Sequence, residues 1–107
     1  MSGSGPTSPP AAPRTLLAGF TARPGRAEEI GGLLAAYAEV VRAEPGCLAF
    51  SPHRLADQPS AFVVYEVYRD EEAFQAHLAG AAGVAFNARL APLIVEEHSQ
   101  LTWLRGL

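Results

Sequence analysis

Residues 61–68 (AFVVYEVY) are the segment that most limits how this chain can fold. The segment is rich in β-branched and aromatic residues, which favours a strand. Side chains alternate between the two faces of a strand, so Phe62 and Val64 lie on one face while Val63 and Tyr65 lie on the other. Because one layer of helices covers only one face of a sheet, the second apolar face needs another cover. A second copy of the chain is the simplest cover, and we therefore expect a homodimer.

The rest of the chain alternates between short apolar segments and amphipathic segments, which Pro and Gly separate. These patterns predict strands at 15–23, 47–55, 61–68 and 93–104, a turn at 57–60, helices at 26–44 and from 70 to a break at 80–83, and a short helix at 84–90. The order β-α-β-β-α-β is that of the split βαβ, ferredoxin-like arrangement. We therefore expect an α+β fold, with the helices on one face of a four-stranded antiparallel sheet.

Length and charge restrict the classes of protein that this chain can belong to. Its 107 residues correspond to one domain. Residues 1–13 (MSGSGPTSPPAAP) have no large side chain after Met1, which predicts a flexible tail before a folded domain at 14–107. The chain has eight Arg, no Lys and eleven acidic residues, for a formal net charge of −3. This acidic balance argues against a nucleic-acid partner.

Cysteine and histidine content also exclude several kinds of site. Cys47 is the single cysteine, which excludes an intrachain disulfide and a cysteine-rich zinc site. The histidines at 53, 77 and 98 lack the spacing of a local metal site, so no metal is expected. No apolar run approaches the roughly 20 residues of a membrane span, and no signal peptide is visible. We therefore expect a cytoplasmic protein without a membrane partner.

Two titratable residues fall at positions where a pocket is expected. His77 lies on the predicted second helix, three residues after Phe74. Imidazole changes its charge near neutral pH, so a histidine in an apolar pocket between helix and sheet can act as a base. The alternative is a histidine at the helix edge that is hydrogen-bonded or solvated.

Glu66 shares a strand face with Phe62, Val64 and Tyr68. A carboxylate in an apolar row must be paired or have a raised pKa. We favour a salt bridge to an arginine, such as Arg54 across the hairpin; the alternative is a base or a group that orients a partner.

Three segments together resemble the antibiotic biosynthesis monooxygenase (ABM) domain family: Pro24-Gly25, residues 44–48 (EPGCL) and residues 65–78 (YEVYRDEEAFQAHL). The resemblance covers nearly everything after the tail, and residues 65–78 are its most specific part. It implies a dimeric α+β barrel of ferredoxin-like protomers, which agrees with the element order and the dimer expected above. Small oxygenases of this family oxidise quinols and aromatic polyketides such as anthrones with O2, without flavin, metal or haem. The resemblance therefore implies no cofactor.

The resemblance also implies a function and, together with the pattern of aromatic residues, a set of site residues. The function is a cofactor-independent monooxygenase, an oxidoreductase of antibiotic biosynthesis that acts on a small aromatic substrate. His77 is the expected base or substrate anchor, because quinol-oxidising members carry a histidine there, and Tyr65 and Tyr68 are the further catalytic candidates. The expected substrate-binding residues are Tyr37, Phe50, His53, Phe74, Asn87 and Trp103. Core packing is the alternative role for each aromatic residue. Two other functions stay open on this fold: a non-catalytic module that binds a small ligand, and a non-oxidative isomerase or cyclase.

Overall fold

The computed structural model describes residues 12–107, which form four strands and three α-helices. In chain order these elements are β1 (Arg14–Thr21), α1 (Ala27–Arg42), β2 (Cys47–Leu55), β3 (Gln58–Tyr68), α2 (Glu71–Ala79), α3 (Ala81–Leu90), a 3-10 turn η1 (Ala91–Leu93) and β4 (Gln100–Leu104). The tail predicted at 1–13 falls mostly outside the described residues.

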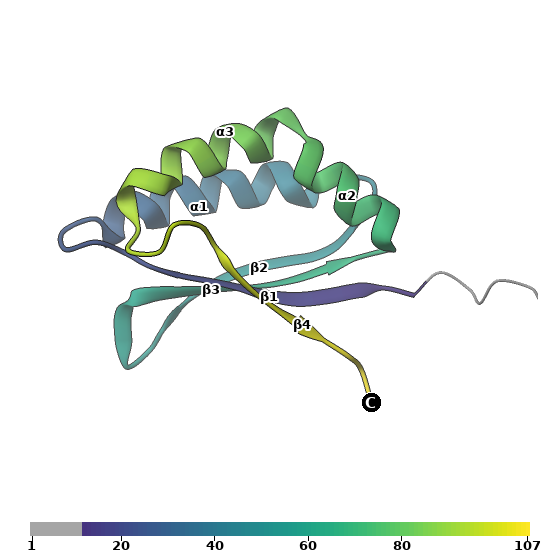
Figure 1. Ribbon diagram of the computed structural model, residues 1–107, viewed down its shortest axis with the longest axis horizontal. Coiled ribbons are helices and arrows are strands. Elements are labelled where there is room, and N and C mark those ends of the chain that lie inside the picture. Colours follow the sequence, from purple (N-terminus) through teal and green to yellow (C-terminus); the bar gives the residue numbers. More distant parts are fainter. Residues whose placement is uncertain (1–11) are drawn as a thin grey trace, which may run out of the picture.

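The described strands form one antiparallel sheet in the order β2-β3-β1-β4. The three α-helices lie on the same face of this sheet, as Figure 1 shows. The chain therefore has the ferredoxin-like α+β fold predicted from its sequence.

Local sequence explains where α1 begins and ends. Glu28 and Glu29 lie in its first turn, where the helix dipole favours negative charge. Its apolar stripe is buried against the sheet and consists of Ile30, Leu34, Tyr37, Ala38 and Val41. Pro45 cannot continue a helix, and the chain turns there into β2.

The second helical region begins at a strong cap and contains one break. The Asp70 carboxylate accepts a hydrogen bond from the backbone N of Ala73 at 2.8 Å, which caps α2. Gly80 is extended (φ −66°, ψ 143°), so α2 ends there and α3 starts at Ala81 rather than at the predicted residue 84. Gly83, the other predicted break, lies inside α3.

The segment before β4 differs from the prediction of a strand over 93–104. Pro92 lies at the start of the 3-10 turn, and β4 begins only at Gln100. Between them, the Glu96 carboxylate accepts hydrogen bonds from the backbone N of Thr21 (2.7 Å) and from its Oγ1 (2.8 Å). These bonds, together with one isolated antiparallel bridge between Ala22 and Ile94, hold an irregular loop against the end of β1 in place of a continuous strand. At the hairpin, Leu55 pairs with Gln58, so β3 starts three residues earlier than predicted.

The two faces of the sheet have different environments. The helix-facing side holds the core, including Phe62 (4% exposed) and Val64 (2% exposed) on β3. Val63 and Val67, on the other face, are only half-buried, and Tyr65 is 42% exposed. The alternation predicted for residues 61–68 is confirmed, and the described residues leave the second face without a covering layer (Figure 1).

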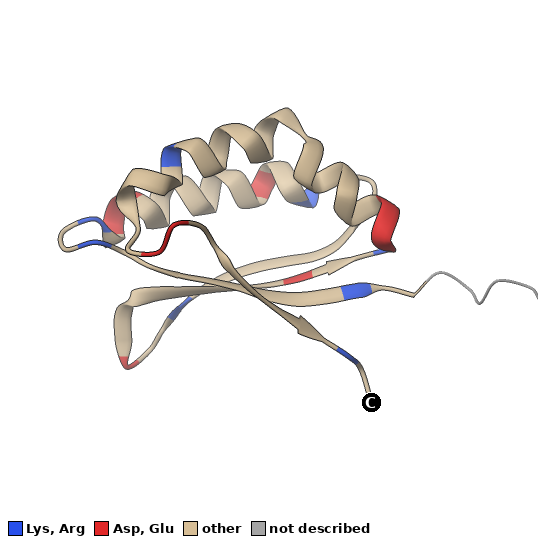
Figure 2. Cartoon of the chain, viewed as in Figure 1, with Lys and Arg blue, Asp and Glu red and all other residues tan. Residues whose placement is uncertain are grey.

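Charged residues gather at helix ends and in connecting segments, and the strands are mostly uncharged (Figure 2). Among the described residues, no helix is both long and apolar enough to span a bilayer.

We predict opposite effects of two glycine-to-alanine substitutions on stability. At Gly46, in the turn after α1, an added Cβ would overlap the Cβ of Ala73 on α2, so Gly46→Ala should destabilise the fold by about 1–3 kcal/mol. Gly32 is the matched control, because it lies exposed on α1 with nothing within 4 Å of an added Cβ. Gly32→Ala should stabilise the protein by about 0.5–1 kcal/mol. Urea unfolding measures both, and a neutral Gly46→Ala would contradict this packing.

Candidate functional site

A cavity of about 80 Å³ lies between the helices and the helix-facing side of the sheet. Most of its wall is apolar or aromatic: Leu16, Ala18, Phe20, Leu34, Tyr37, Phe50, Val64, Phe74, Leu78, Phe86 and Leu101. Glu66, His77, Asn87 and Ser99 supply its polar groups. An apolar cavity with a few convergent polar groups is the usual form of a small-molecule site.

Aromatic rings from three elements form one side of this cavity. The Tyr37 ring on α1 stacks on Phe86 of α3, with ring centroids 4.1 Å apart and planes 5° apart. It also meets the edge of Phe50 on β2 at 5.7 Å. Such packing makes this side of the cavity aromatic and apolar.

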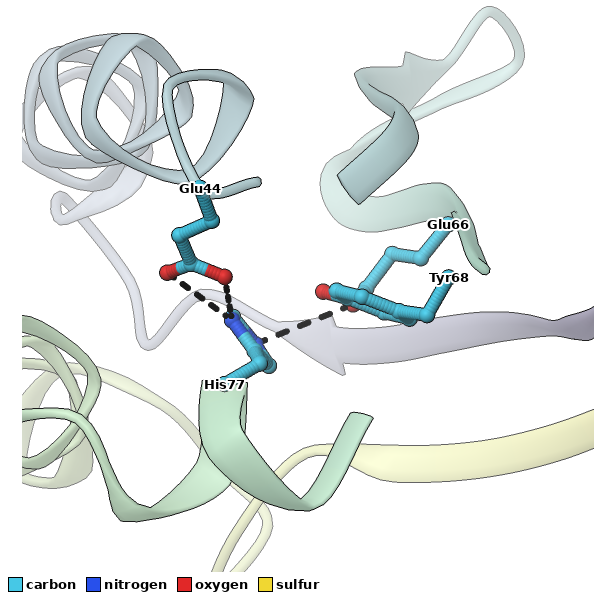
Figure 3. A network of polar contacts seen from close by, with 4 residues as sticks. All are labelled: Glu44, Glu66, Tyr68 and His77. Atoms are coloured by element: carbon cyan, nitrogen blue, oxygen red, sulfur yellow. Dashed lines mark hydrogen bonds and ion pairs between the residues drawn. The ribbon is translucent and has the colours of Figure 1, made fainter. Parts of the chain in front are cut away.

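His77 is the titratable group that α2 brings to the cavity wall, and its side chain is only 9% exposed. Its Nδ1 lies 3.1 and 3.3 Å from the two carboxylate oxygens of Glu44, which is in the turn between α1 and β2 (Figure 3). A carboxylate can only accept, so Nδ1 donates this hydrogen bond and the neutral ring keeps a lone pair on Nε2. Within the described residues Nε2 makes no hydrogen bond, and Glu66 Oε1 lies 4.0 Å away from it.

Glu66 is a buried carboxyl group in the apolar row of β3 and is 6% exposed. Its Oε1 accepts a hydrogen bond of 2.6 Å from the Tyr68 hydroxyl, which lies two residues further along the same face (Figure 3). Burial raises the pKa of Glu66 above its ordinary value, although the Tyr68 hydrogen bond and nearby His77 partly oppose this shift. The carboxyl group therefore holds a proton more readily than a solvated glutamate does.

Two tyrosine hydroxyls lie near these acids. Burial is the largest cause that raises the pKa of Tyr68, and the charge and hydrogen bond of Glu66 raise it further. Burial likewise raises the pKa of Tyr37, with additional contributions from Glu44 and Glu66. Both phenols stay protonated at neutral pH and act as donors rather than as bases.

The structure gathers several of the residues expected at the site. His77, Tyr37, Phe50, Phe74 and Asn87 all line the cavity. Tyr68 is not part of the wall, but it is fully buried behind Glu66 and its ring lies 4.9 Å from that of His77.

Other expected site residues lie elsewhere. Tyr65 is on the opposite face of the sheet and is 42% exposed. His53 is exposed on β2, with its Nδ1 3.0 Å from the backbone O of Ser51. Trp103 on β4 lies outside the cavity wall: it packs edge-on against Phe74 at 5.0 Å, with the Arg14 guanidinium 4.0 Å from its ring centroid.

The prediction of a salt bridge between Glu66 and Arg54 is wrong. Arg54 pairs instead with Glu28 at 3.0 Å and donates to the backbone O of Pro59. The register explains this, because Glu66 is opposite Phe50 and Arg54 lies four residues further along β2.

Glu44 is the site residue that sequence reasoning missed. In the sequence it stands before Pro45, at the end of a helix, and opens the segment EPGCL, but neither feature gave it a role at the site. Its partner His77 lies 33 residues further along the chain, so no local spacing connects the two. Residues 12–107 contain no group of three or more His, Cys, Asp or Glu side chains placed to hold a metal ion.

Comparisons with known proteins agree with the fold and identify the family. The profile described as "Antibiotic biosynthesis monooxygenase" (ABM) matches residues 13–89, which is more than half of the chain. The protein therefore belongs to the ABM family.

Solved structures show the same fold over nearly the whole chain. Rv0793 from Mycobacterium tuberculosis is 27% identical with a TM-score of 0.82, covering 90% of this chain and 96% of that one. PA3566 from Pseudomonas aeruginosa is 30% identical with a TM-score of 0.82, covering 89% and 94% respectively. A comparison with curated proteins gives no match.

We predict a pH-dependent stability that originates from Glu66. Its pKa is raised in the folded state, so stability should fall as pH rises from 4.5, the ordinary value, through that raised pKa. Glu66→Gln removes this titration and can still accept from Tyr68, so its stability relative to wild type should increase with pH. The melting temperature of Glu66→Gln relative to wild type should therefore be higher at pH 8 than at pH 4.5. Thermal melts between pH 4.5 and 8 measure this difference, with exposed Glu72→Gln as the control. A difference that does not change with pH would contradict the assignment.

Proposed function

We propose that the protein is a cofactor-independent monooxygenase that oxidises a quinol- or anthrone-type aromatic compound with O2. The observation that carries this proposal is the lone pair on His77 Nε2, at the wall of an apolar, aromatic cavity, on a ring that Glu44 holds through Nδ1. Membership of the ABM family supports the same class of activity.

The chemistry requires little from the protein beyond a base and a dry pocket. His77 Nε2 removes a proton from the phenol or from its keto tautomer, which gives an electron-rich anion. This anion reduces O2 directly, and a C–O bond forms to give a hydroperoxide after the proton returns. Loss of water then produces the quinone, so one oxygen atom enters the product and the other leaves as water. Exclusion of solvent strengthens each polar contact to the developing charge.

The size of the cavity limits how large an aromatic substrate can be. An apolar cavity of about 150 Å³ holds benzene, and this cavity is smaller, at about 80 Å³. A ring therefore enters only when side chains at the rim move outward. Leu78 (47% exposed) and Leu101 (46% exposed) line the cavity and face solvent, which leaves them free to move. This argument favours single-ring quinols over tricyclic anthrones.

A non-oxidative isomerase or cyclase is the second candidate function. The close set of Glu44, His77 and Glu66 supports it, because a base beside a carboxyl group that readily holds a proton can move a proton between two carbon or oxygen positions without O2.

We also infer that a second copy of the chain covers the open face of the sheet. The apolar side chains of this face come from three neighbouring strands: Leu17, Val63, Tyr65, Val67 and Leu104. A contiguous apolar surface of this kind is typical of an interface, and two copies of one sheet face match each other by two-fold symmetry.

Oxygen uptake with a panel of simple quinols and anthrone tests the proposed activity, with autoxidation without protein as the background. We expect saturable uptake that survives chelation, and His77→Ala should reduce it by about 10²–10⁴-fold, the usual contribution of a general base. His98→Ala is the matched control, because His98 is exposed in the loop before β4.

Other outcomes identify the alternatives. Turnover without oxygen uptake would replace the oxygenase by an isomerase or cyclase. Thermal stabilisation by a phenol without any turnover would indicate a binding module.

Tyr65→Arg tests the inferred dimer. We expect wild type to sediment at twice the protomer mass, and Tyr65→Arg to shift it towards the monomer because a charge would be buried at the interface. Val84→Arg is the control, since Val84 is 60% exposed on α3, away from the open face. A wild-type protein that sediments as a monomer at high micromolar concentration would refute the dimer.

A further inference from the structure

A second hollow lies on the outer side of His77. This groove, of about 350 Å³, runs along the turn after α1 and the exposed flank of α2, and both Glu44 and His77 line it. His77 also lines the main cavity, whereas Glu44 does not. The imidazole therefore separates the two spaces, with Nδ1 and Glu44 on the groove side and Nε2 towards Glu66.

We propose that Glu44 is a positioning residue for catalysis: from the groove it fixes the His77 ring with Nε2 unprotonated, and it stabilises the imidazolium that forms when Nε2 takes the substrate proton. This inference rests on the proposed function of His77 as the base.

Two carboxyl groups flank the ring, and their geometry distinguishes their roles. Glu44 lies at 3.1 and 3.3 Å from Nδ1, within hydrogen-bond distance, whereas Glu66 lies at 4.0 Å from Nε2. Glu66 already accepts a hydrogen bond from Tyr68. Only Glu44 therefore orients the ring directly, and the gap at Nε2 leaves that atom available to a substrate hydroxyl.

In the proton transfer one bond to hydrogen breaks and another forms. The substrate O–H or C–H bond breaks and the Nε2–H bond forms, while the Nδ1–H bond to Glu44 stays in place. The imidazolium then faces the Glu44 carboxylate as an ion pair, and Nε2 later returns its proton to the peroxide oxygen. Glu44 itself gains no proton, and the ring ends each cycle in its starting tautomer.

The location of Glu44 suits this role. Its side chain is 28% exposed, so solvent in the groove contacts the carboxylate while the His77 ring stays buried at 9%. Glu66, by contrast, is buried on the cavity side, where it lacks that hydration and holds a proton more readily.

A matched pair of variants separates positioning from simple structural support. Glu44→Gln can keep a hydrogen bond to Nδ1, but it removes the charge, and its amide N–H can also stabilise the tautomer with Nε2 protonated. We expect kcat for quinol-dependent oxygen uptake to fall about 10- to 100-fold with KM unchanged, because Glu44 does not line the main cavity. Glu72→Gln removes the same charge from the same groove without a hydrogen bond to His77, and it should leave kcat unchanged. A kcat for Glu44→Gln equal to that of wild type would overturn the proposal.

Chemical rescue adds a readout that a purely structural role would not give. Glu44→Ala opens a space next to Nδ1 that the groove connects to solvent. Millimolar formate should enter this space and restore part of the lost kcat of Glu44→Ala, and it should not restore that of His77→Ala. Absence of rescue, in a variant whose melting temperature matches wild type, would contradict the proposal.

A measurement without any substrate distinguishes failure of this inference from failure of the proposed function. Nitrogen-15 NMR of labelled histidine reports the tautomer of His77 directly. We expect wild type to carry the neutral-ring proton on Nδ1, Glu44→Ala to show a mixture of tautomers, and formate to restore the wild-type spectrum. If this pattern holds but no quinol or anthrone supports oxygen uptake, the orienting role of Glu44 stands and the oxygenase function fails. If wild type carries the proton on Nε2, the inference fails whatever the activity.

Discussion

The burial of the Glu66 carboxyl group on the helix-facing side of β3 is the constraint on which the rest of the site depends. A carboxyl group that is 6% exposed must be hydrogen-bonded or protonated, and the apolar row around it offers few partners. Tyr68 supplies a donor from the same strand, and His77 approaches from α2 at 4.0 Å. The polar groups at this end of the cavity are therefore present because one acidic residue, Glu66, lies in an apolar row of the core. The aromatic wall beside Glu66 excludes the water that would otherwise solvate it.

Contacts outside the cavity determine where His77 lies. Asp70 caps α2 and fixes its first turn, and the close approach of Gly46 to Ala73 packs that helix onto the turn that carries Glu44. The backbone N of Arg69 also donates to the O of Gly46 at 2.8 Å, which ties the end of β3 to the same turn. The Glu44–His77 contact is thus a consequence of how α2 packs on this turn. Small changes in that packing would change the orientation of the His77 ring without any substitution in the cavity wall.

Periodicity in the sequence predicted the fold, because each element buries one regular stripe or face. Periodicity did not predict those features that depend on a single contact between residues distant in the sequence. The loop before β4 is set by Glu96 binding Thr21, 75 residues away, and the Glu44–His77 pair spans 33 residues. Alternation along β3 already separates Tyr65 from Glu66 and Tyr68, and the structure places Tyr65 on the opposite face from both.

Strand β3 carries residues of the site on one face of the sheet and residues of the open face on the other. Glu66 and Tyr68 point into the site, and the residues between and beside them, Tyr65 and Val67, point to the open face. A partner that packs on the open face would restrict the backbone of β3, and the same restriction would hold Glu66 at its distance from His77. Ordering of this kind lowers the entropy that the site loses when a ligand binds. Association through the open face would therefore act on the cavity through β3, because no residue of that face lines the cavity.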